Sequence, residues 1–166
     1  MTSENTDLEY ARIADTQYLV RRSMTKGYQL FSILTPPVYI GLSLYRKGRG
    51  HITVNRLLRA TWLGGVAGIS SGGAFEYVRS SNSTSETLRS RRIRAAIDRA
   101  SHRADDHATI GALLFAVLTP AIFWKHGAAI HLVFGGAGLG TAAGYFTHIA
   151  RSASGDVPPT PVVPDS

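Results

Sequence analysis

The residues of this chain that could do chemistry are few. His102, Asp105, Asp106 and His107 have the composition of a metal site, but their spacing matches no strong metal-ligand pattern. Aspartates just before an apolar segment are also typical N-caps of a helix, and we prefer this interpretation for Asp105 or Asp106. The chain contains no cysteine, so disulfides, thiolate metal sites and thiol catalysis are excluded.

Glu76, His131 and His148 are titratable residues that lie within or near apolar segments. Neutral histidines bonded between helices are the simpler interpretation, and a proton relay is the alternative. Residues 135–140 read Gly-Gly-x-Gly-x-Gly, but they follow no strand, so a dinucleotide loop is not indicated. No nucleophile–base pair stands out. We therefore expect a protein that is not an enzyme and that binds no metal or redox cofactor.

The elements that carry these residues are unusually free of charge. All 29 charged residues lie outside four stretches, namely Gly27–Tyr45, Ala60–Phe75, His107–Trp124 and His126–Ala150. Each stretch approaches the roughly 17–25 residues that a helix needs to cross a membrane. An amphipathic helix of a soluble bundle would show a charge every third or fourth residue on its outer face. The pattern therefore predicts an all-α membrane protein.

The expected architecture is four transmembrane helices arranged as two tandem hairpins. The spans are placed at about 23–45, 58–78, 107–124 and 127–150. A polar arm with a short helix precedes them over 1–22, where Thr6 and Glu9 have capping-box spacing. A basic amphipathic helix beginning near Ser83 is expected to connect the hairpins. Residues 152–166 contain four prolines and are predicted to be a flexible tail.

The two hairpins read as an internal repeat. Residues 27–39 align without a gap with residues 111–123, and six of the 13 positions are identical, including a shared Leu-Thr-Pro. Two spans per unit give both hairpins the same direction through the membrane, so a pseudo-twofold axis along the membrane normal is expected.

Glycines recur at every fourth position in the second and fourth spans. Such stripes let a neighbouring helix approach closely. We expect them to pack within the chain, where they could hold the second and fourth spans together. The alternative is that they face a partner protein. Prolines inside the first and third spans are expected to kink them, with Thr35 and Thr119 satisfying the freed backbone groups. The predicted packing residues are Gly64, Gly68, Gly72, Gly136, Gly140 and Gly144, and the predicted kinks are Pro36, Pro37 and Pro120.

The formal net charge of +7 resides in the connecting segments. In a membrane protein, basic loops bind anionic lipid headgroups, so bound phospholipid or cardiolipin is expected and nucleic acid is not. The candidate headgroup contacts are Arg46, Lys47, Arg49, Arg91, Arg92 and Arg94.

One part of the chain resembles a known family. The run Asp105-Asp-His-Ala-Thr-Ile-Gly-Ala-Leu-Leu-Phe-Ala-Val-Leu-Thr-Pro-Ala-Ile-Phe-Trp-Lys125, followed by His131-Leu-Val-Phe-Gly-Gly-Ala-Gly-Leu-Gly140, is similar to the small fungal membrane family known as NUXM. The resemblance implies a multi-pass accessory subunit of respiratory complex I in the mitochondrial inner membrane. Its partners would be other membrane subunits, and it implies no catalytic residues.

Two other functions remain open at this point. An arrangement of four spans with glycine stripes is also similar to the Tim17-like proteins, which include translocase subunits. Prolines within spans also occur in transporters and channels, where broken helices line a substrate site. A water-filled path lined by Glu76, His131 or His148 would favour transport.

Overall fold

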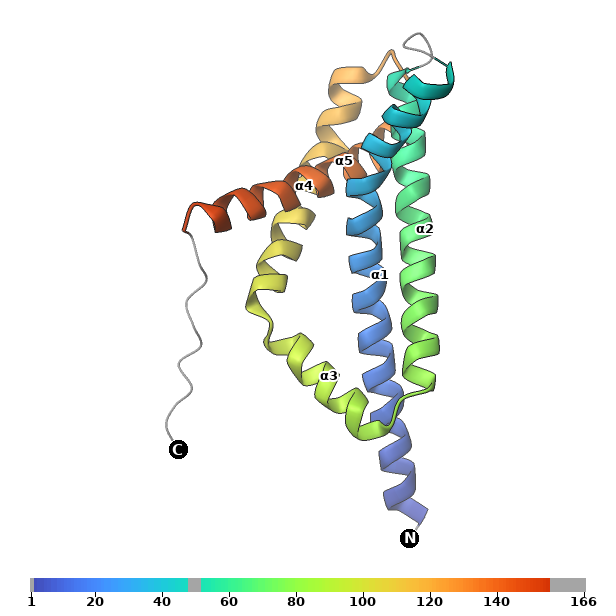
Figure 1. The fold of residues 1–166 in the computed structure, drawn as a ribbon, viewed down its shortest axis with the longest axis vertical. Coiled ribbons are helices and arrows are strands. Elements are labelled where there is room, and N and C mark those ends of the chain that lie inside the picture. The colour runs from blue at the N-terminus through green and yellow to red at the C-terminus, as the bar shows by residue number, and fades with distance from the viewer. Residues whose placement is uncertain (1, 48–51, 156–166) are drawn as a thin grey trace.

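The computed structural model describes residues 2–47 and 52–155. Within these residues the chain is entirely helical and contains no strand. Its five helices are α1 (Thr2–Lys47), α2 (Val54–Ser81), α3 (Ser85–Ile97), α4 (Arg99–Phe123) and α5 (Ala129–Ala153). In Figure 1, α1 and α2 lie side by side as the first hairpin. The second hairpin consists of α4 and α5, which cross near the end of the first hairpin that is remote from the N-terminus, and α3 joins the two hairpins.

The first helix is longer than expected. It runs without interruption from Thr2 to Lys47, so the expected boundary between a polar arm over 1–22 and a span from 23 lies inside one helix. The helix also continues through Pro36 and Pro37. A capping box at Thr6 and Glu9 predicted a separate short helix there, and this prediction is wrong because the backbone is already helical before Thr6.

The connecting segment forms two helices. The N-cap of α3 is Thr84, whose hydroxyl accepts a hydrogen bond from the amide of Thr87. The segment breaks at Asp98, which ends α3 and caps α4 by accepting a hydrogen bond of 3.1 Å from the amide of Ser101. The expectation that Asp105 or Asp106 caps the third span is therefore wrong, because α4 begins at Arg99. The expected tail lies outside the described residues from residue 156 onward.

The burial pattern is the reverse of that in a water-soluble protein. Polar side chains are buried between the helices, among them Gln29, Ser32, Thr61 and Thr141. Only four large apolar side chains among the described residues are buried, and these are Leu19, Leu58, Leu88 and Leu132. Large apolar side chains instead cover the outside of every long helix. Exposed apolar surface of this extent indicates contact with lipid or with other proteins.

Two helices, α4 and α5, are long and apolar enough to cross a membrane. The helices α1 and α2 are less hydropathic, since α1 contains Gln29 and two prolines and α2 is rich in glycine and serine. By length and composition, the described residues therefore support two spans and not the four that were expected.

Candidate functional site: the helix seams and the connecting ion pairs

A glycine seam joins α1 to α2. Gly68 lies against Gly27 so closely that a Cβ on either residue would overlap the backbone of the other. Gly72 lies against the carbonyl of Ser23, and Gly64 lies against the side chain of Thr35. The small residues thus bring the two backbones into contact at Gly68 and Gly72, where dispersion and weak Cα–H bonds stabilise the pair.

An equivalent seam joins α4 to α5. Gly140 lies against Gly111, Gly144 against the carbonyl of His107, and Gly136 against the side chain of Thr119. As in the first seam, a Cβ at any of the three striped glycines would meet the neighbouring helix.

The contacts of the two seams correspond position by position. Adding 84 converts 23, 27 and 35 of α1 into 107, 111 and 119 of α4, and adding 72 converts 64, 68 and 72 of α2 into 136, 140 and 144 of α5. The glycine stripes therefore face into the molecule, but each packs against the preceding helix, and the two stripes do not meet each other. Thr35 and Thr119 lie in these seams as contacts for glycine.

The two hairpins meet through a second glycine face of α5. Gly135 lies against Leu58 of α2, and a Cβ on Gly138 would lie 2.8 Å from Cγ2 of Thr61. The closely spaced glycines of residues 135–140 thus allow α5 to approach α4 on one side and α2 on the other. The glycine stripes alone do not predict this second face, although the one-residue offset between Gly135 and Gly136 is a signal of it in the sequence.

Three histidines take part in contacts between helices. Nε1 of Trp62 on α2 donates a hydrogen bond of 3.0 Å to Nδ1 of His131 on α5. The rings of His107 on α4 and His148 on α5 have centroids 5.5 Å apart. Among the described residues, no three His, Asp or Glu side chains are grouped as they would be to hold a metal ion.

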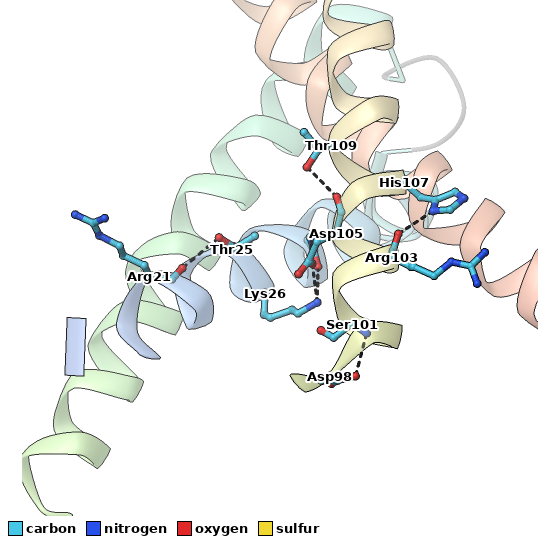
Figure 2. Close-up of polar contacts among 10 residues, drawn as sticks. Arg21, Thr25, Lys26, Asp98, Ser101, Arg103, Asp105, His107 and Thr109 are labelled. Atoms are coloured by element: carbon cyan, nitrogen blue, oxygen red, sulfur yellow. Dashed lines mark hydrogen bonds and ion pairs between the residues drawn. The ribbon is translucent and has the colours of Figure 1, made fainter. Parts of the chain in front are cut away.

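A charged group ties α1 to α4. Asp105 accepts a bond of 2.6 Å from Nζ of Lys26 (Figure 2). It accepts another of 2.6 Å from Nε2 of Gln29. Charge-assisted hydrogen bonds of this length are the stronger kind. This contact joins the first helix of one hairpin to the first helix of the other.

The helix α3 is held by one apolar side chain and two ion pairs. Leu88 is fully buried. Arg91 donates to Glu76 at 2.5 Å, and Arg92 donates to Asp15 at 2.5 Å. Glu76 also accepts a bond of 3.1 Å from the hydroxyl of Ser80.

The predicted headgroup residues therefore separate into different groups. Arg91 and Arg92 are engaged within the chain, whereas Arg46 and Arg94 are exposed. Arg49 and the side chain of Lys47 lie outside the described part of the chain. The prolines predicted as kinks, Pro36, Pro37 and Pro120, all lie within continuous helices.

In comparisons with known proteins, no family model, no curated protein and no solved structure matches the chain.

Proposed function

We propose that this chain is a non-catalytic structural subunit of a membrane complex, with α1, α2, α4 and α5 forming two tandem hairpins within the bilayer. The observation that carries the proposal is the reversed burial pattern, with glycine and hydroxyl side chains between the helices and large apolar side chains outside. Close packing on small residues is the way helices associate in lipid, where apolar surface provides no drive to bury itself.

The less hydropathic helices α1 and α2 also fit this proposal. On α1, Leu30, Leu34 and Val38 are exposed at helical spacing, and on α2, Leu63 and Val66 are exposed. Gly64, Gly68 and Gly72 of α2 lie in the seam, and Gln29 and Ser32 of α1 are buried, so the average hydropathy of each helix understates how apolar its outer face is.

We further propose that the complex is the NADH:ubiquinone oxidoreductase of the mitochondrial inner membrane. The support for this step is the resemblance of residues 105–125 and 131–140 to the NUXM family. The contacts found for Glu76 and His131 agree with a structural role, because each is engaged with a neighbouring helix. In this role the chain would stabilise the membrane arm without carrying electrons or protons.

The outer face of α4 is the proposed contact with other subunits. Only 11% of the most apolar stretch of α4 is buried within the chain, compared with 44% of the most apolar stretch of α5. Leu113 and Val117 lie one turn apart on this face and are 66% and 69% exposed. A partner helix that packs here would cover exposed apolar side chains of α4.

Native electrophoresis after mild detergent extraction, followed by mass spectrometry, tests the proposal. We expect the chain to migrate with the core subunits of complex I. The variant Leu113→Ala/Val117→Ala should release it, whereas the control Leu30→Ala/Leu34→Ala, which shortens two exposed leucines of α1, should not. Migration of the wild-type chain by itself would overturn the subunit proposal, and bound precursor proteins would favour the translocase alternative.

A small transporter is the second candidate, favoured by the buried polar residues between the hairpins. Ser32 and Thr61 are fully buried there, and the hydroxyl oxygen of Ser32 has no hydrogen-bond partner among the described residues. A water-filled path along these residues would be detected by solute or proton flux in vesicles that contain only the purified chain.

A further inference from the structure

A groove with a volume of about 710 Å³ lies between α1 and α2 near the N-terminal end of α1. Arg12 and Arg21 line it together with Thr16 and Gln17, which can donate hydrogen bonds. Among the described residues, no Asp or Glu lines this groove. The lining therefore carries positive charge and neutral donors without a balancing acid, which is the composition of an anion site.

The two arginines are available to a ligand. Arg12 is held over the end of α2 because its Nη2 donates to the carbonyls of Ser81 and Ser83, at 3.4 and 3.2 Å. The remaining N–H groups of its guanidinium are not used in these bonds. The side chain of Arg21 points away from the Lys26–Asp105 pair (Figure 2), and no ion pair engages it within the described residues.

A second groove, of about 450 Å³, continues from the first along the same helix pair. The two grooves share Arg21 and Met24, and the second extends to Tyr28 of α1 and Ile69 of α2. The charge-free stretches of α1 and α2 begin beside it, at Gly27 and Phe75. The polar groove thus lies at the expected membrane boundary, and the second groove leads from it into the apolar zone.

We propose that the two grooves together bind one anionic phospholipid. Arg21 takes the phosphate, at the junction of the grooves, and an acyl chain lies along Met24, Tyr28 and Ile69. Nine residues of helix separate Arg12 from Arg21 by about 14 Å, so Arg12 reaches the outer part of the headgroup. The occupant is a lipid because a charged groove that opens directly into an apolar one matches an amphipathic anion and not a free ion.

This inference rests on the proposed insertion in a membrane but not on the identity of the complex. It also assigns lipid binding to arginines other than those expected from the sequence, since Arg91 and Arg92 are occupied by Glu76 and Asp15.

Native mass spectrometry of the detergent-purified, delipidated chain tests the site, with phosphatidylglycerol as the probe. We expect one phosphatidylglycerol per chain to bind about tenfold more tightly than phosphatidylcholine, which carries no net charge. The variant Arg12→Gln/Arg21→Gln should lose this preference. The control Arg79→Gln/Arg89→Gln removes the same charge from exposed positions near the same end of the molecule and should keep it.

A second pair of variants tests the acyl groove without changing the charge. Thr25 lines the second groove, so Thr25→Trp should fill it and weaken phosphatidylglycerol binding several-fold. Thr147→Trp, at an exposed threonine of α5 with the same kind of hydroxyl bond to the preceding turn, is the matched control.

Three results would overturn the inference: equal binding of the two lipids, equal losses in the arginine variant and its control, or equal binding of glycerol 3-phosphate, which has the phosphate but no acyl chain. If the arginine variant does not fold, competition between the two lipids for the wild-type chain still decides the headgroup preference. These measurements use the isolated chain, so they can fail while the native-gel test succeeds, and the reverse also holds.

Discussion

At the scale of single residues, glycine has different roles at different places in this chain. Gly140 and Gly111 allow α4 and α5 to touch, and a Cβ at Gly140 would overlap the carbonyl of Gly111. Gly41 has no neighbouring heavy atom within 4 Å of a Cβ built there. Both glycines lie inside helices, where glycine is otherwise unfavourable relative to alanine. Only the contact between helices explains Gly140, and no contact explains Gly41.

The pair Gly140→Ala and Gly41→Ala tests this difference. We expect Gly140→Ala to lower the free energy of unfolding in detergent by about 1–3 kcal/mol, because the added methyl group forces two backbones apart. Gly41→Ala should leave it unchanged or raise it by about 0.5–1 kcal/mol, because alanine loses less backbone entropy in a helix. Thermal unfolding followed by circular dichroism measures both. Equal effects of the two substitutions would contradict the seam.

The contact of Asp105 with Lys26 and Gln29 is the second feature at this scale. Asp105→Asn removes the negative charge that receives both bonds, and we expect a loss of about 1–2 kcal/mol in stability. The neighbouring exposed aspartate supplies the control, Asp106→Asn, which should change little. A double-mutant cycle with Lys26→Met should give a coupling energy above about 0.5 kcal/mol. A coupling energy of zero would show that the ion pair does not stabilise the fold.

At the scale of elements, α3 is a helix that packs on its neighbours through ion pairs and not through a stripe of apolar side chains. The helix buries one large residue, Leu88, while Ile93 and Ile97 are exposed. Its arginines at 91 and 92 bind acids of α2 and α1, so the helix is held mainly at two charged points. The sequence predicted a basic helix that lies on the membrane or on a partner. It did not predict the ion pairs, because they join residues 15 and 77 positions apart and cannot be read from local spacing.

Removing the two ion pairs should loosen α3. We expect Arg91→Ala/Arg92→Ala to accelerate hydrogen–deuterium exchange of the amides over 85–97, because Leu88 alone would then hold the helix. Arg89→Ala/Arg94→Ala is the control, since both side chains are exposed and no salt bridge involves them among the described residues. Similar exchange in the two variants would show that Leu88 is sufficient.

At the scale of the whole molecule, the reversed burial pattern determines where the chain can be stable. Its outer surface carries large apolar side chains on α1, α2, α4 and α5, and water solvates such a surface poorly. Its interior contains hydroxyl and amide groups and backbone contacts through glycine. A chain of this kind gains stability from lipid or from protein partners that cover the outside.

Extraction of membranes with alkaline carbonate tests this property. We expect the chain to remain in the membrane pellet, because carbonate releases proteins held by charge and leaves those embedded through apolar surface. Purification should require detergent throughout. A peripheral membrane protein from the same preparation is the control and should appear in the supernatant. Recovery of this chain as a folded monomer in buffer would contradict the membrane assignment.

The sequence by itself determined the helical class, the absence of thiol chemistry and the positions of the glycine stripes. These properties depend on local composition and on spacing along one helix, which a linear pattern records directly. The capping signals were less informative, because Thr6 and Asp105 matched local rules that the longer helices α1 and α4 override.

Only the tertiary structure decided which helix each glycine stripe meets, which acids pair with Arg91 and Arg92, and where a charged groove opens into an apolar one. Each of these features joins residues that are far apart in the chain, and several partners would satisfy the same local pattern. The choice among them depends on how the two hairpins cross, which is set by the simultaneous packing of α5 against α4 and α2.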